Sequence, residues 1–93
     1  MREEYKKEEH VIEKTEKQKD MEIMRSLIKT KIELDTANKN FEYAEDDLID
    51  YYTYQIKANQ SKLDYLTRVA KSRNISINII TKKYLDIKRN EAV

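Results

Sequence analysis

Apolar side chains recur at alternating spacings of three and four residues along two long stretches of the chain. Each stretch has seven such positions, with a few small or polar residues among them. The first series is Ile23, Leu27, Thr30, Leu34, Ala37, Phe41 and Ala44, and the second is Ile49, Tyr52, Ile56, Asn59, Leu63, Leu66 and Ala70. Spacing of this kind places a continuous stripe on one face of an α-helix. The pattern therefore predicts two long amphipathic helices, at about residues 20–45 and 47–73.

The two stripes fit each other when the chain reverses direction at Asp46 and Asp47. Each facing pair of residue numbers then sums to 93, so one turn position aligns all seven layers. In three layers an Ala faces an Ile, which helps to keep facing helices at a constant separation. We predict an all-α protein built on an antiparallel helical hairpin, with Phe41 facing Tyr52 in a buried layer next to the turn. The expected hairpin core is Leu27, Leu34, Phe41, Tyr52, Ile56, Leu63 and Leu66.

Residues at both ends of the second predicted helix are suited to capping it. We expect the carboxylate of Asp46 or Asp47 to cap the second helix. Asp50 would lie in its first turn, where the helix dipole favours an anion. Asn74 is the best residue available for a left-handed cap after this helix, because the chain contains no Gly.

Two segments flank the predicted core of residues 20–73. Residues 1–19 form a charged arm, and the thirteen charged side chains among the first 20 residues favour a solvated, fraying helix or disorder. Residues 74–93 form an Ile-rich basic segment that fits either a short third helix capped by Ser76 or a short strand. We favour the helix because a lone strand has nothing to pair with in this chain.

The amino-acid composition disfavours several fold classes and excludes several kinds of functional site. Charged residues make up 40% of the 93 residues, and the chain contains no Gly, Pro or Cys. Without Gly and Pro it has few residues suited to tight turns, which disfavours β-sandwiches and barrels. Without Cys and Gly it has no disulfide, zinc–cysteine site or Gly-rich phosphate loop. No apolar run approaches a membrane span and the N-terminus is too charged for a secretory signal, so we expect a cytoplasmic protein.

A distinctive block of residues surrounds the predicted turn. It consists of Leu34, Ala37, Asn40, Phe41, Asp47, Leu48, Ile49, Asp50, Tyr51, Tyr52, Tyr54, Ala58, Tyr65, Leu66, Ala70 and Lys71. In these residues the chain resembles the YaaL-like family of small uncharacterised proteins from low-GC Gram-positive bacteria. Asp47 stands where a Pro often occurs in that family. The resemblance implies a small cytoplasmic helical protein and brings no activity, cofactor or catalytic residue.

Residues suited to catalysis or metal binding are few. Asp46, Asp47 and Asp50 match the Asp-Asp-x-x-Asp spacing of magnesium motifs in prenyl-transferring enzymes. Helix capping accounts for these aspartates, and the chain has no second acidic motif of this kind. His10 is the single histidine and lies in the charged arm, and the four serines have no plausible base nearby. We expect no enzyme activity, cofactor, metal or small-molecule substrate.

The tyrosines of the second helix are the residues best suited to binding. Tyr51, Tyr54 and Tyr65 lie on a second stripe of that helix, and Tyr is enriched at interfaces because its ring buries a large area. Packing of these rings against the third helix or a second copy is the first interpretation, and a separate protein partner is the second. Because a lone hairpin buries little surface, a third helix, a homodimer or a client protein must cover it.

Basic residues offer an alternative function. Residues 73–93 carry five basic side chains against two acidic ones. Arg68, Arg73, Lys82 and Lys83 could contact phosphates while the tyrosines stack on single-stranded bases. Five acidic residues in the tyrosine-bearing segment weaken this interpretation. We therefore predict a non-catalytic protein–protein interaction or adaptor module, with a nucleic-acid-associated accessory protein that uses the basic C-terminal segment as the alternative.

Overall fold

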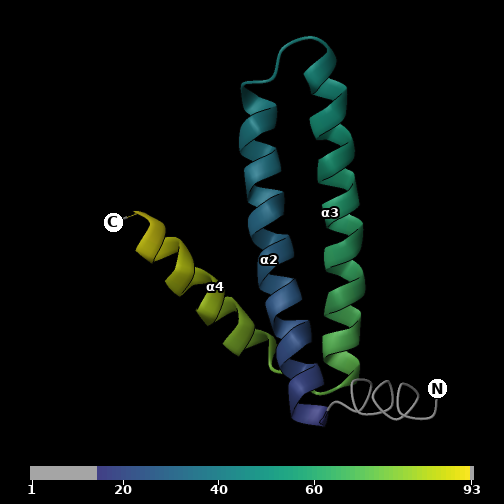
Figure 1. Cartoon of the computed structure of the whole chain (residues 1–93), viewed down its shortest axis with the longest axis vertical. Coiled ribbons are helices and arrows are strands. Elements are labelled where there is room, and N and C mark those ends of the chain that lie inside the picture. Colours follow the sequence, from purple (N-terminus) through teal and green to yellow (C-terminus); the bar gives the residue numbers. More distant parts are fainter. Residues whose placement is uncertain (1–14, 93) are drawn as a thin grey trace, which may run out of the picture.

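The protein is a helical hairpin with a third helix that leans away from it. A computed structural model describes residues 15–92, and within that range it contains three helices and no strand: α2 (Glu16–Glu42), α3 (Asp47–Ser72) and α4 (Ile77–Ala92). In Figure 1, α2 and α3 run side by side in opposite directions, and α4 starts at the end away from the turn and diverges from α2. The predicted all-α hairpin is confirmed, and residues 77–92 are helical, so the strand alternative is wrong.

The first helix begins earlier than its apolar stripe predicts. Thr15 is its N-cap: the Thr15 hydroxyl accepts from the Gln18 N–H at 3.1 Å, and the Gln18 side chain accepts from the Thr15 N–H at 3.0 Å. This reciprocal capping box satisfies two backbone donors and lets the helix start at Glu16 rather than near residue 20. Residues 16–19 of the predicted arm are therefore helical. Residues 1–14, with His10, lie outside the described part of the chain.

The start of α3 differs from the sequence expectation. Asp46 is the N-cap residue, but its side chain makes no capping hydrogen bond. Its backbone, at φ 48° and ψ −118°, lacks the extended conformation from which a capping side chain reaches the first-turn N–H groups. The predicted carboxylate cap is therefore wrong. Asp47 and Asp50 do lie in the first turn, as expected from the helix dipole.

The end of α3 is a Schellman motif built without glycine. Asn74 has φ 60°, so the predicted left-handed cap is confirmed. The Asn74 N–H donates to the Lys71 carbonyl at 3.1 Å, and the Ile75 N–H donates to the Ala70 carbonyl at 2.9 Å. Asn tolerates this conformation better than most residues with a Cβ atom. The motif turns the chain into α4, where the Ile79 N–H donates to the Ser76 hydroxyl at 3.4 Å, as predicted for a Ser76 cap.

The buried core lies at the end of the hairpin where α4 joins it. Leu27, Leu66, Ala70 and Ile80 form one cluster that brings the three helices together. Leu27 and Leu66 were predicted to face each other, and both are buried. Leu34, Ile56 and Leu63 of the predicted core are only half-buried. The third helix therefore decides which part of the stripe becomes a core.

The predicted buried layer next to the turn is wrong. Phe41 is 42% exposed and Ile49 is 41% exposed, while Tyr52 is half-buried. Two helices alone can cover only the face that each presents to the other, and α4 does not reach this end of the hairpin (Figure 1). The apolar stripe thus continues to the turn, but burial does not.

Arg73 joins α2 and α3 at the end of the hairpin away from the turn. Its Nη2 lies 2.5 Å from Glu16 Oε2, and its Nε lies 2.6 Å from Asp20 Oδ1. The hydrogen bond and charge of Arg73 lower the pKa of the Glu16 carboxyl below its ordinary value. In the same contact, hydrogen bonds to Asp20 and Glu16 raise the pKa of Arg73. The guanidinium therefore clamps the first turn of α2 to the end of α3.

We expect this clamp to make stability pH-dependent. Because the folded-state pKa of Glu16 is lowered, its stabilisation is complete above the ordinary pKa of a Glu carboxyl. That stabilisation is lost as the pH falls through the lowered value. Arg73→Gln should reduce the melting temperature slightly at neutral pH, and the difference from wild type should shrink in acid. Thermal melts of both proteins across the acid range measure it, and a difference independent of pH would contradict the clamp.

Candidate interaction surfaces

Three tyrosines form an exposed row along α3. Tyr51, Tyr54 and Tyr65, called here the tyrosine row, are 52%, 69% and 58% exposed. The expectation that the third helix covers these rings is wrong, because α4 packs elsewhere on the hairpin: Leu27, Ile28 and Lys31 of α2 and Leu63 and Thr67 of α3 line the junction. Helical periodicity places those residues on another side of the helix pair from the row. Within the described residues, the row therefore remains exposed.

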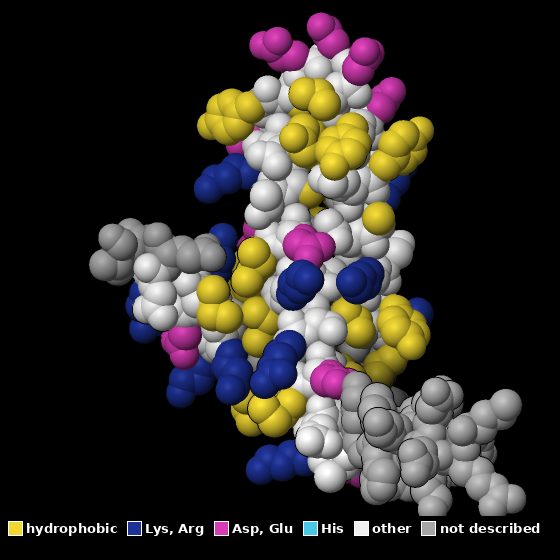
Figure 2. Space-filling model, viewed as in Figure 1, with side chains coloured by type: hydrophobic (Ala, Val, Ile, Leu, Met, Phe, Trp, Pro, Cys, Tyr) yellow, Lys and Arg dark blue, Asp and Glu magenta, His cyan; other side chains and the backbone are white. Residues whose placement is uncertain are grey.

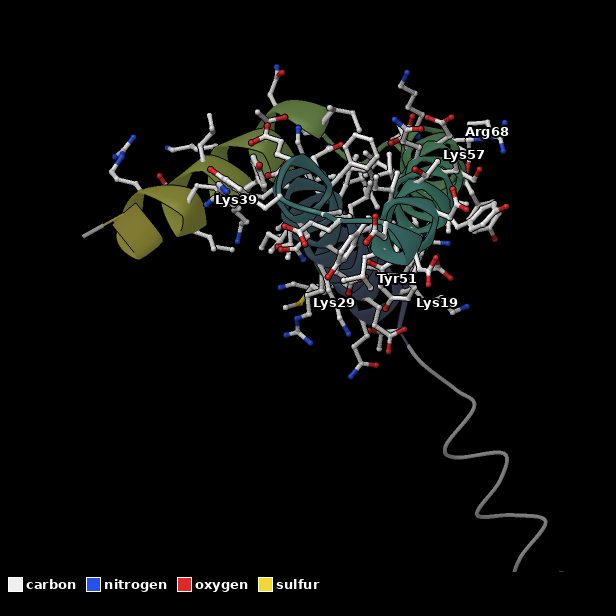
Figure 3. The ribbon with its side chains drawn as sticks, turned by 90° about the horizontal axis from the view of Figure 1, so that it is seen from above. Lys19, Lys29, Lys39, Tyr51, Lys57 and Arg68 are labelled. Carbon is white, nitrogen blue, oxygen red and sulfur yellow. The ribbon has the colours of Figure 1, made fainter. Side chains whose placement is uncertain are left out.

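A shallow groove between α2 and α3 borders one end of the tyrosine row. Its lining residues are Ile32, Glu33, Thr36, Ala37 and Asn40 of α2 and Tyr51, Tyr52 and Gln55 of α3, and its volume is about 420 Å³. The Gln55 amide donates to the Tyr51 hydroxyl at 2.8 Å. The rings of Tyr51 and Tyr52 meet edge to face, with centroids 5.0 Å apart. These contacts hold the Tyr51 ring at the edge of the groove (Figure 3).

The predicted basic residues do not gather beside Tyr51. Figure 3 shows Arg68 pointing to a different side of the hairpin from Tyr51. Arg73 is held by Glu16 and Asp20 at the end of the hairpin. Lys82 and Lys83 lie exposed on α4. Arg68 lies one helical turn from Tyr65, but Arg73, Lys82 and Lys83 lie away from the row, so the structure does not gather the full set of rings and cations that a nucleic-acid groove requires.

Tyr84 anchors α4 to α2 alongside the packing of Ile80. The Tyr84 hydroxyl donates to the Asp35 carboxylate, and the Lys31 ammonium lies 4.8 Å from the centroid of the Tyr84 ring. Lys88 approaches the same carboxylate at 3.6 Å. A hollow of about 100 Å³ remains beside Tyr84, which is small compared with pockets for drug-sized ligands. We assign it to imperfect packing at the junction.

A second apolar surface surrounds the hairpin turn. Phe41, Tyr43, Leu48 and Ile49, called here the tip cluster, are 42%, 81%, 52% and 41% exposed. The sequence reasoning missed it because the heptad stripe assigned Phe41 and Ile49 to the core. A signal was present: residues 40–56 contain five acidic side chains and no basic one. Figure 2 shows these acidic side chains gathered at the end of the hairpin beside hydrophobic ones.

The acidic residues of the turn do not form a metal site. Within residues 15–92 no group of three or more His, Cys, Asp or Glu side chains is placed to hold a metal ion. The described helices also include none that is long and apolar enough to cross a membrane. The features that remain are exposed aromatic and charged surfaces on a small helical scaffold.

The fold and these surfaces define a small all-α hairpin protein. The chain belongs to the family described as a protein of unknown function (DUF2508), which matches residues 3–77. That match covers both hairpin helices and the Schellman turn and ends as α4 begins. No curated protein and no solved structure matches the chain.

Proposed function

We propose that this protein is a non-catalytic interaction module that binds another protein through the tyrosine row of α3. The observation that carries the proposal is the exposure of Tyr51, Tyr54 and Tyr65, each more than half exposed on a helix whose opposite face is packed. Tyrosine loses little conformational entropy when it is immobilised, and its hydroxyl can keep a hydrogen bond after the ring is buried. These properties suit a surface that binds a protein.

The groove beside Tyr51 supports the same function. Its floor is Ala37, which is 3% exposed, and Asn40 and Gln55 add amide groups at its edges. An apolar side chain of a partner could enter between α2 and α3 while the amides pair with its backbone. Binding of this kind needs no cofactor and no catalytic residue. The proposal also assigns the chain to the YaaL-like family of low-GC Gram-positive bacteria, which it resembles in the residues around the turn.

The alternative is an accessory protein that binds nucleic acid through α4. The exposed Lys82, Lys83 and Arg89 favour it, since they lie within three turns of one helix. The acidic turn argues against nucleic-acid binding, because residues 40–56 would repel phosphates at one end of the molecule. The two functions thus use different surfaces, so variants can separate them.

Capture of the partner from native lysate, with and without nuclease, tests the proposal. Wild-type protein should capture a defined protein partner in both conditions. The variant Tyr51→Ala/Tyr54→Ala/Tyr65→Ala should lose that partner, because truncating interface tyrosines costs roughly 2 kcal/mol or more at a hot spot. The matched variant Lys82→Ala/Lys83→Ala/Arg89→Ala should retain it. Capture that depends on nucleic acid and on the basic residues would instead support the alternative.

A further inference from the structure

The molecule carries opposite charge at two exposed apolar surfaces. Residues 40–56, which hold the tip cluster, have five acidic and no basic side chains, a net charge of −5. Residues 77–92, which form α4, have four basic and two acidic side chains, a net charge of +2. Each region therefore combines an apolar surface with an excess of one sign of charge.

The exposed side of α4 is itself amphipathic. Ile79 and Leu85 are each 52% exposed, and Lys82, Lys83 and Arg89 are exposed around them. These five residues are called here the outer face of α4: Lys82 lies opposite Ile80 and Tyr84 on the helix, Ile79 and Leu85 lie on its two flanks, and the exposed Asp86 is next to it. Figure 2 shows basic side chains around α4 and acidic ones at the far end of the hairpin. Two exposed aliphatic side chains on either side of a lysine, with further basic side chains nearby, suit a partner that is apolar and acidic.

The two surfaces lie toward opposite ends of the hairpin. The tip cluster lies at the turn, whereas α4 starts at the other end, beyond the C-terminus of α3 (Figure 1). A second copy that runs in the opposite direction would place its turn beside α4 of the first copy. A two-fold axis between the copies then makes the same contact twice, which closes the assembly as a dimer.

We infer that the protein forms an antiparallel homodimer in which the tip cluster of each copy docks on the outer face of α4 of the other. Phe41, Tyr43 and Leu48 pack against Ile79 and Leu85 in each contact. The acidic side chains around the turn face Lys82, Lys83 and Arg89. This pairing covers the end of the hairpin that α4 leaves exposed within its own chain. Its residues differ from those of the tyrosine row, whose first member, Tyr51, lies one helical turn beyond Leu48.

Charge reversal on each surface tests the pairing. Glu42→Lys/Glu45→Lys/Asp47→Lys changes the net charge of residues 40–56 from −5 to +1. Lys82→Glu/Lys83→Glu changes that of α4 from +2 to −2. By sedimentation or light scattering at low salt, wild type should be a dimer that salt weakens. Each variant alone should associate at least about tenfold more weakly, because like charges then face each other.

Mixing the two variants should restore the dimer. In a mixed pair the reversed turn faces the reversed α4, and the unchanged turn faces the unchanged α4, so both contacts are attractive. A single chain that carries all five substitutions should also dimerise. The control Lys29→Glu/Lys57→Glu reverses two exposed lysines outside both surfaces and should leave the dimer intact. Circular dichroism checks that every variant stays folded.

Four results would overturn the inference. They are a monomeric wild type at all concentrations, no recovery on mixing, loss of the dimer in the tyrosine-row variant, and growth beyond a dimer. Loss of the dimer in the tyrosine-row variant would place the self-association surface on the row instead. Growth beyond a dimer would indicate an open head-to-tail chain. The loss of the partner in the tyrosine-row variant is independent of all of these results, because that variant leaves both charged surfaces unchanged.

Discussion

Leu27→Ala is expected to destabilise the protein by about 2–5 kcal/mol, which is typical when a buried Leu is truncated. Leu27 is 4% exposed and belongs to the cluster in which Leu66, Ala70 and Ile80 meet. The substitution therefore leaves a cavity where the three helices join. A domain of this size has on the order of 5–15 kcal/mol of total stability, so this loss is a large share of it. Chemical denaturation of wild type and variant gives the difference.

Phe41→Ala is the matched control for that experiment. The apolar stripe alone assigns Phe41 to the core and predicts a loss of about 3–5 kcal/mol. Because Phe41 is 42% exposed beside the turn, less of its surface leaves water on folding and the loss should be well below that of Leu27→Ala. Equal losses for the two variants would show that the turn end is packed as tightly as the α4 end, contrary to the structure.

Tyr84→Ala should release α4 from the hairpin. The Tyr84 side chain is 9% exposed, and it combines ring packing, a hydrogen bond to Asp35 and the Lys31 ammonium over its ring. Truncation of a large buried aromatic costs about 3–5 kcal/mol. A 16-residue helix is marginal in isolation, so α4 should lose most of its helicity once it is undocked. Amide hydrogen exchange should become faster across Ile77–Ala92, with smaller changes at the turn end of the hairpin.

Two variants separate the causes of this effect. Leu85→Ala removes the next side chain, which is 52% exposed; measured in the charge-reversed Lys82→Glu/Lys83→Glu background, which weakens the proposed dimer, it should leave the amide protection of α4 nearly unchanged. Tyr84→Phe removes only the hydroxyl that donates to Asp35, so it should loosen α4 less than Tyr84→Ala does. If Leu85→Ala exposed α4 as fully as Tyr84→Ala, the anchor would not be the Tyr84 ring.

Local sequence determined the helices and the way the chain leaves the hairpin. The heptad stripes predict two antiparallel helices because a period near 3.6 is set by backbone geometry, whatever later covers the stripe. The capping roles of Asn74 and Ser76 could also be predicted from the sequence, because a left-handed cap and a hydroxyl cap depend on one or two adjacent residues. Thr15 and Gln18 have the sequence spacing of a capping box. This box lets the helix begin within the charged arm.

Only the tertiary structure decided which apolar residues are buried. Leu27 and Phe41 occupy equivalent stripe positions, yet the first is 4% exposed and the second 42%. The difference arises because α4 packs at one end of the hairpin, and its direction is set by contacts between distant residues such as Tyr84 and Asp35. Arg73 likewise became a clamp only when folding brought it to Glu16 and Asp20, more than fifty residues away. Periodicity determines a helix face, whereas burial depends on what the rest of the chain places against that face.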